Sequence, residues 1–148
     1  MISLQSHEFM NPKISDYIIS SEKVAHVQMG NSLEHALLVL TKSGYSAIPV
    51  LDARFRIHGL ISSSMITESI LGLERIEFEK LGEKKVEDVM AVTYPQVHLD
   101  DRFEKALDLL IDHAFLCVVD KEGYFEGIFT RSALLKELRT YIHKINEL

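Results

Sequence analysis

The sequence predicts a mixed α/β fold that contains two copies of one unit, ordered strand–helix–strand–strand–helix. Two short apolar strands joined by a polar turn occur twice, in residues 44–64 and again in residues 114–132. In both hairpins an aspartate precedes a glycine with the same spacing, Asp52 to Gly59 and Asp120 to Gly127. A pattern that recurs with one order and spacing indicates an internal repeat, so the chain is expected to form two related halves.

The first copy is expected to span residues 14–71, after a lead-in of residues 1–13. A short strand is predicted at 23–27, and Asn31 or Ser32 can cap the helix that follows. Apolar residues with helical spacing form its inner face: Leu33, Ala36, Leu37 and Leu40. Gly44 ends this helix. In the hairpin, the turn is built on residues 52–54, Gly59 begins the second strand, and a second helix covers about 64–71.

The second copy is expected to span residues 86–148. Between 27–40 and 97–110, five of fourteen aligned positions are identical without a gap. Val97 therefore opens a strand, and Asp100 and Asp101 are expected to cap a helix. The inner face of that helix matches the first copy: Phe103, Ala106, Leu107 and Leu110. A closing helix over 132–146 has five apolar residues: Leu134, Leu135, Leu138, Ile142 and Ile145.

A charged segment, residues 72–85, separates the copies and has no counterpart in the repeat. It alternates acidic and basic residues with a few leucines and isoleucines. Two interpretations remain open: a solvated helix or linker between the halves, or a contact for a dimer or another partner.

Composition and the motifs present argue against several classes of function. A net charge of −6 in 148 residues argues against a general nucleic-acid or anionic-membrane surface, and no apolar run is long enough to span a bilayer. The single cysteine, Cys117, lies in an apolar strand and cannot form an internal disulfide, which favours a reducing cytoplasm. The histidines lack zinc-ligand spacing, and neither a nucleophile elbow nor a phosphate loop is present. The sequence therefore predicts a binding protein and not an enzyme, with no catalytic cofactor.

The repeat resembles a pair of CBS domains, which form one pseudo-twofold Bateman module. The resemblance rests on the small residues of the strand 46–50, on a Gly-x-x-Ser/Thr pattern ending each hairpin, and on the Val-x-Asp-Val-Met sequence at 86–90. It covers roughly residues 14–138. What it implies is binding of an adenine nucleotide in a cleft between the copies.

Carried over position by position, the resemblance assigns one ligand-binding cleft. Its residues come from both copies: Lys23, Val24, Ala25, Tyr45, Ser46, Ala47, Ile48 and Pro49, with Thr130, Arg131 and Ser132. Arg131 and Lys23 supply positive charge for phosphate, and Tyr45 can stack on a purine. The alternatives are a surface arginine at 131, a core tyrosine at 45 and a solvated lysine at 23.

The mirror-related cleft has no cation in the matching positions, so one occupied site per chain is expected. Its residues would be Thr93, Tyr94, Phe115 and Leu116 with Ser62, Ser63 and Ser64, whose hydroxyls alternatively cap a helix.

The ligand is expected to be cyclic di-AMP, with AMP or ATP as the alternative. The family's usual ribose-binding Asp is replaced by Met65 in the first copy and Ala133 in the second, and neither can bind a ribose diol. A cyclic dinucleotide has no free diol. The whole chain is similar to the small stand-alone cyclic di-AMP-binding CBS proteins of Gram-positive bacteria.

That similarity implies a regulator whose free form stimulates a target such as the (p)ppGpp synthetase/hydrolase of the stringent response or pyruvate carboxylase, and whose ligand blocks the contact. A homodimer is expected through the apolar helix faces at 66–71 and 134–145. The competing hypothesis is a ligand-independent dimeric scaffold.

Overall fold

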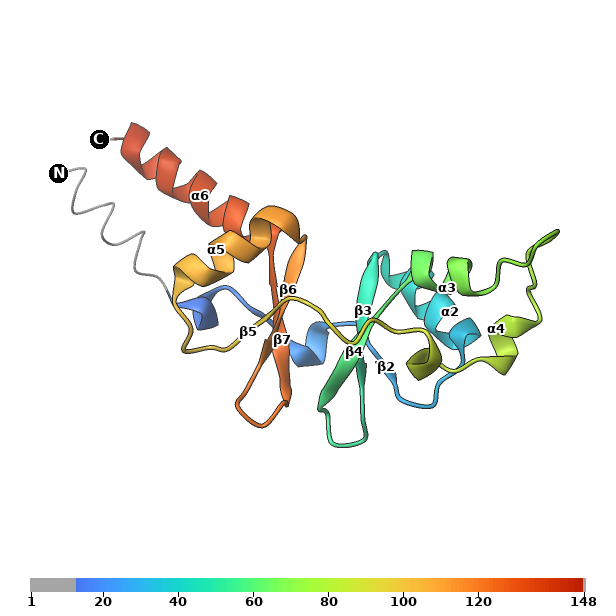
Figure 1. Ribbon diagram of the computed structural model, residues 1–148. Coiled ribbons are helices and arrows are strands. Elements are labelled where there is room, and N and C mark those ends of the chain that lie inside the picture. The colour runs from blue at the N-terminus through green and yellow to red at the C-terminus, as the bar shows by residue number, and fades with distance from the viewer. Residues whose placement is uncertain (1–12, 148) are drawn as a thin grey trace. The chain divides into compact units, whose positions relative to one another are not determined.

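The computed structural model describes residues 13–147, which form two compact units (Figure 1). Residues 23–94 and 122–125 form the first, named here the β3–β4 unit after its central hairpin. Residues 13–22, 95–121 and 126–147 form the second, the β6–β7 unit. Most of the predicted lead-in, residues 1–12, lies outside the described residues.

The β3–β4 unit contains a three-stranded sheet with helices. Its elements are β2 (Val27–Gln28), α2 (Leu33–Ser43), β3 (Ala47–Leu51), β4 (Ile57–Ser62), α3 (Ser63–Ser69), α4 (Lys80–Glu83) and the 3₁₀ turn η3 (Val86–Asp88). The strand order is β2-β3-β4, with β2 parallel and β4 antiparallel to β3. A register shift follows the pairing of Val50 with Gly59.

The β6–β7 unit repeats this plan with one more strand. Its elements are η1 (Ile14–Asp16), β1 (Ile19–Ser20), β5 (Gln96–Val97), α5 (Phe103–Asp112), β6 (Phe115–Val119), β7 (Phe125–Thr130, whose first residue belongs to the other unit) and α6 (Arg131–Asn146). The sheet order is β1-β7-β6-β5, with β5 parallel to β6 and β1 antiparallel to β7. A 3₁₀ turn, η2 (Ser21–Lys23), follows β1.

Each unit includes the opening segment of the other sequence copy. Ile14, at the start of the first copy, is completely buried in the core of the β6–β7 unit. Val86, at the start of the second, is completely buried in the core of the β3–β4 unit, and Ala91 pairs with Leu60 of β4 in both directions. The mixed α/β fold with two repeats is confirmed, and the opening segments are exchanged between them.

Local sequence explains the ends of α2 as expected. The Ser32 hydroxyl accepts a hydrogen bond from the His35 N–H at 3.1 Å, and Gly44 ends the helix with a left-handed φ of 78°. The predicted inner faces of α2 and α5 are confirmed, because Leu33, Ala36 and Leu40 and the matching residues of α5 are buried.

Four details of the prediction are wrong. Of residues 23–27 only Val27 is in a strand, and Gly59 lies inside β4 instead of beginning it. Residues 100 and 101 do not cap α5, which begins after Arg102 without a side-chain cap. Asp101 instead accepts hydrogen bonds from the His98 N–H at 2.8 Å and from the Lys105 ammonium. Helix α3 ends at Ser69, two residues before the predicted Leu71.

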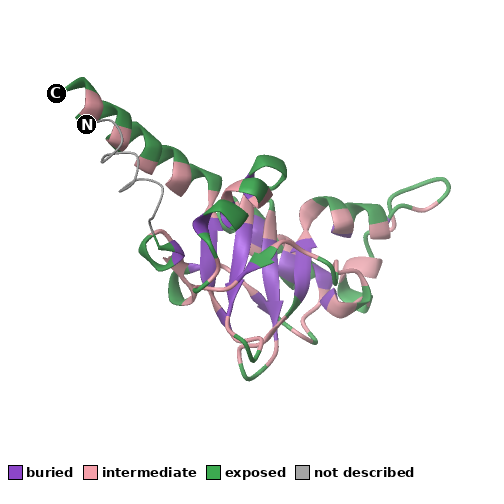
Figure 2. Cartoon of the chain, turned by 60° about the vertical axis from the view of Figure 1, so that its left-hand side comes forward, coloured by how far each residue is buried: buried purple, intermediate pink, exposed green. Residues whose placement is uncertain are grey.

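The burial pattern separates the sheets from the last helix (Figure 2). The central strands of both sheets and the inner faces of α2 and α5 carry buried residues, whereas the described residues of α6 include none that is buried. Three apolar side chains of α6 are exposed: Leu135, Leu138 and Ile142. The expectation for the face at 66–71 is wrong for Ile66 and Ile70, because both are buried in their own unit.

Candidate ligand-binding site

Arg131 begins α6 directly after β7, and its side chain reaches the end of α5. Its Nε donates a hydrogen bond to the Leu110 carbonyl at 3.0 Å, and an Nη donates to the Ile111 carbonyl at 3.4 Å. Its main-chain N–H donates a hydrogen bond to the Ala114 carbonyl. A cation at a helix C-terminus satisfies carbonyls that the helix leaves unpaired and interacts favourably with the helix dipole. The guanidinium is therefore held in place, and some of its five N–H groups remain for an anion.

The two hydroxyl residues beside Arg131 have different environments. Thr130 is the N-cap of α6, and its hydroxyl oxygen accepts the Ala133 N–H at 3.0 Å. A hydroxyl that accepts one hydrogen bond still has a proton to donate. Ser132 is exposed in the first turn of α6. Both hydroxyls therefore remain able to contact a phosphate oxygen.

A cavity of about 340 Å³ lies over the first turns of α6. It is lined by Arg131, Ser132, Leu135, Lys136 and Arg139. Three of these five residues are cationic, in a chain whose net charge is −6. Sequence reasoning missed Lys136 and Arg139, although their helical spacing from the predicted pair at 131 and 132 is the signal that points to them.

The other eight predicted residues belong to the β3–β4 unit. Lys23 is exposed at the end of η2, whereas Val24 is buried and Ala25 is half-buried. Tyr45 is half-buried and packs against the core of its unit. A half-buried ring still leaves part of its surface for stacking.

Strand β3 restricts what the remaining residues of this set can offer. Ser46 is exposed and Ala47 is half-buried, but the side chains of Ile48 and Pro49 are buried. Ile48 belongs to the core cluster of the unit, so its side chain is already occupied by packing. The small residue at 47 leaves the start of the strand accessible.

Two of the residues assigned to the mirror-related cleft, Ser62 and Leu116, have structural roles. The Ser62 hydroxyl caps α3 by accepting the Met65 N–H at 3.2 Å, and it lies 3.1 Å from the Ser64 hydroxyl. Leu116 is completely buried in the core of the β6–β7 unit. The capping interpretation of Ser62 is therefore confirmed.

Three further observations bear on function. Burial raises the pKa of the Cys117 thiol to about 12, so this cysteine is an apolar core residue and not a nucleophile. Among residues 13–147, no group of His, Cys, Asp or Glu side chains is arranged to bind a metal ion. No helix in the same range combines the length and apolar character that crossing a membrane requires.

Comparison with known proteins places this architecture in a family. Residues 14–72 and 86–140 match the family model described as the CBS domain. The chain is 53% identical over 147 residues to cyclic di-AMP receptor B of Bacillus subtilis (strain 168), a match that covers 99% of this chain and 100% of that protein. That relative is named a receptor, in agreement with the prediction of a binding protein.

Solved structures agree with this match. The CbpB protein of Listeria monocytogenes in complex with c-di-AMP is 59% identical, with a TM-score of 0.83 over 88% of this chain and 97% of that one. A CBS domain-containing protein of unknown function from Bacillus anthracis is 61% identical, with a TM-score of 0.84 over 91% and 98%. With both sequence copies matched, the chain belongs to the CBS domain family, as a protein with two CBS domains.

Proposed function

We propose that this chain is a cytoplasmic sensor of cyclic di-AMP that regulates partner enzymes through ligand-dependent protein–protein interaction. The ligand would contact the residues that the sequence predicts in both CBS repeats. In this proposal the first repeat spans residues 14–71 and the second spans residues 86–148. The observation that carries the proposal is the Arg131 guanidinium, which two α5 carbonyls hold in place while leaving N–H groups for a phosphate.

The relatives support this choice of ligand. One is named a cyclic di-AMP receptor at 53% identity over nearly the full length, and another at 59% identity was solved with c-di-AMP. The cationic cavity at Arg131, Lys136 and Arg139 suits a ligand that carries two phosphates.

The residues that replace the ribose-binding Asp support a cyclic ligand over AMP or ATP. Met65 packs partly on the core of the β3–β4 unit, and the Ala133 side chain packs on the core of the β6–β7 unit. The alanine side chain has no acceptor and the methionine sulfur is only a weak one, so neither replaces a carboxylate that binds a ribose diol. A linear nucleotide would lose that contact, whereas a cyclic dinucleotide has no diol to satisfy.

Isothermal titration with cyclic di-AMP, AMP and ATP in parallel tests the ligand. We expect about one cyclic di-AMP per chain and weaker binding of both linear nucleotides. Arg131→Met should weaken cyclic di-AMP binding about 10- to 100-fold, because hydrogen bonds to charged groups contribute about 1.5–3 kcal/mol each. Arg54→Met, at an exposed hairpin arginine, is the matched control.

The other outcomes distinguish the alternatives. Binding of AMP or ATP without cyclic di-AMP would mean that the missing Asp does not select against a diol. No binding of any of the three would leave the ligand-independent scaffold.

Partner regulation follows from differential affinity. In this proposal the free chain binds and stimulates an enzyme, such as the (p)ppGpp synthetase/hydrolase or pyruvate carboxylase, and the ligand shifts the chain to a state that does not bind. The ligand can change partner affinity only by as much as its own affinity differs between the two states.

A homodimer is part of the same proposal. Helix α6 exposes 55% of Leu135 and 49% of Ile142, an apolar stripe that a second copy would cover. We expect a dimer in sedimentation velocity at micromolar concentration, and a monomer with unchanged circular dichroism for Leu138→Glu/Ile142→Glu. A wild-type monomer would contradict this part.

A further inference from the structure

The charged segment between the CBS repeats forms an ordered projection, named here the finger (residues 70–80). Leu71 and Ile76 pair as an antiparallel bridge. The Gly72 N–H donates to the Arg75 carbonyl at 2.8 Å, and the Glu77 N–H donates to the Ile70 carbonyl at 2.7 Å. In Figure 1 this segment extends outward between α3 and α4, and in Figure 2 it is mostly exposed.

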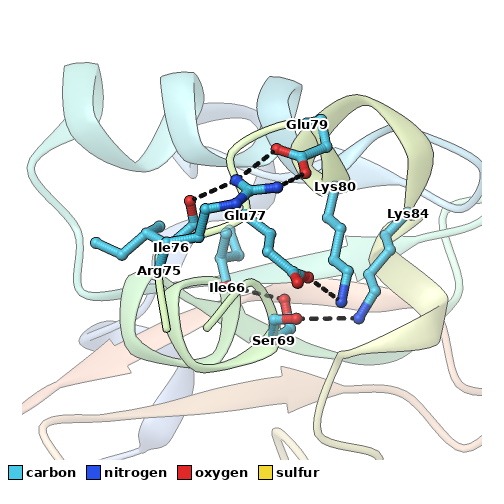
Figure 3. Close-up of polar contacts among 8 residues, drawn as sticks. All are labelled: Ile66, Ser69, Arg75, Ile76, Glu77, Glu79, Lys80 and Lys84. Carbon is cyan, nitrogen blue, oxygen red and sulfur yellow. Dashed lines mark hydrogen bonds and ion pairs between the residues drawn. The ribbon is translucent and has the colours of Figure 1, made fainter. Parts of the chain in front are cut away.

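Side-chain interactions also hold the finger in one conformation (Figure 3). The Arg75 guanidinium forms a two-point ion pair with the Glu79 carboxylate and also donates a hydrogen bond to the Ile76 carbonyl. Lys80 forms an ion pair with Glu77. At the base, the Lys84 ammonium donates to the Ser69 carbonyl at 3.0 Å. The hydrogen bond from Arg75 lowers the pKa of Glu79 to about 2, so this pair stays ionised at neutral pH.

The finger exposes large apolar side chains from its turn, at Leu73, to its base, at Phe78, whose neighbour Glu77 donates its N–H to the Ile70 carbonyl. Leu73 is fully exposed, at 107% of its reference area, and Phe78 is 64% exposed. Leu71 and Ile76 are also exposed. Isolated surface leucines need no explanation, but four apolar side chains on eight consecutive residues of a fixed loop form a contact surface.

The charges of the finger indicate the kind of surface that it can contact. Both cations of the finger, Arg75 and Lys80, are paired within it, so neither is free to meet an acidic surface. Glu74, next to the tip leucine, is exposed and has no ion pair or hydrogen bond to the described residues. The finger therefore presents apolar area with one uncompensated negative charge.

The position of the finger is consistent with a role outside the common fold. It has no counterpart in the second copy, and most of it lies outside the residues that match the CBS domain. Apart from Ile70 at its base, the finger contributes little to the core, because its other large apolar side chains are exposed and the core cluster of the β3–β4 unit does not include them.

We propose that the finger is a docking element for a protein partner, inserting Leu73 and Phe78 into an apolar pocket that basic side chains border. Such a pocket would cover the exposed apolar side chains of the finger and place a lysine or arginine against Glu74. The inference rests on the proposed function for the existence of a partner enzyme, and it adds which surface of this chain the partner contacts.

The test measures binding of the full chain to purified (p)ppGpp synthetase/hydrolase and to pyruvate carboxylase from the same organism, by biolayer interferometry. Leu73→Ser/Phe78→Ser should weaken binding about 10- to 100-fold, the range seen for anchor residues. Both side chains are exposed, so this variant should fold normally. Glu74→Gln should bind more weakly than wild type at low salt, and the difference should shrink as salt screens the charge.

Leu38→Ser is the matched control, because Leu38 is a similarly exposed leucine on α2 of the same unit. It should bind both the enzyme and cyclic di-AMP as wild type does. Cyclic di-AMP titration of the finger variant should also be unchanged, which separates loss of docking from loss of the ligand site.

Each other outcome overturns the inference in a distinguishable way. A finger variant that binds the enzyme like wild type refutes docking through the finger and leaves the proposed function intact. If the wild-type chain binds neither enzyme, both the docking and the partner part of the proposed function are refuted. The cyclic di-AMP titration then still tests ligand binding on its own. A finger variant that loses self-association in sedimentation identifies a second copy, and not an enzyme, as the occupant.

Discussion

Replacing the glycine in each central hairpin tests the exchange of opening segments. A Cβ at position 127 would lie 2.2 Å from the Ile19 carbonyl oxygen, and a Cβ at position 59 would lie 2.5 Å from the Ala91 carbonyl oxygen. Both contacts are to backbone, which cannot rotate away as a side chain can. Gly127→Ala therefore requires β1 to move away from β7, which disturbs the pairing of Ile19 with Ile128.

The magnitude follows from the two costs of that movement. Overpacking in a well-packed site costs about 1–3 kcal/mol. Weakening one or two main-chain hydrogen bonds adds about 1 kcal/mol each. We expect Gly127→Ala to lower the free energy of unfolding by about 2–5 kcal/mol. Gly59→Ala should lower it by somewhat less, because the second nearest atom there is the flexible Met90 sulfur at 2.9 Å.

Urea denaturation followed by far-ultraviolet circular dichroism measures this effect. Gly82→Ala is the control, because its Cβ would meet nothing closer than a Glu34 carboxylate oxygen at 3.8 Å. That change lies in α4 and should leave stability unchanged or raise it by up to about 1 kcal/mol. If Gly127→Ala unfolds within about 0.5 kcal/mol of wild type, the close approach of β1 to β7 is wrong.

Three further predictions concern single groups. Ser32→Ala removes the cap of α2, so the free energy of unfolding should fall by about 1 kcal/mol in urea denaturation, and an unchanged value would contradict the capping role. Cys117 should not react with a thiol reagent at pH 8 until urea unfolds the chain, because burial raises its pKa to about 12. The hydrogen bond from His58 lowers the pKa of Asp52 to about 2, so the resulting stabilisation is present above the carboxyl's ordinary pKa near 3.8 and is lost as pH falls toward 2. In His58→Ala, carboxyl NMR titration should show the pKa of Asp52 returning toward its ordinary value.

Local patterns were sufficient to predict most of the fold. Helix faces with apolar residues at fixed spacing, the Ser32 cap and the Gly44 end are short-range features, and the structure has them where expected. The repeat itself predicted the two hairpins. Strand 23–27 was misplaced because isolated apolar residues near Lys23 resemble a strand, while the main chain there turns in a 3₁₀ conformation.

The candidate site was less predictable for a physical reason. Arg131 was assigned by motif, but its hydrogen bonds to the end of α5 join residues 20 and 21 positions apart, which no local pattern encodes. Lys136 and Arg139 lie on the predicted closing helix, but the motif that assigns Arg131 ends at Ser132 and gives no reason to extend the site along α6. Burial of Ile48 and Leu116 likewise depends on the packing of each sheet.

The exchanged opening segments explain why the two sequence copies depend on each other. A copy of roughly 60 residues has little apolar surface to bury, and it is correspondingly marginal alone. Here the first copy would also lack the core position that Val86 fills, and the second would lack Ile14 and the strand that pairs with β7. Each repeat thus needs the opening residues of the other repeat to complete its core.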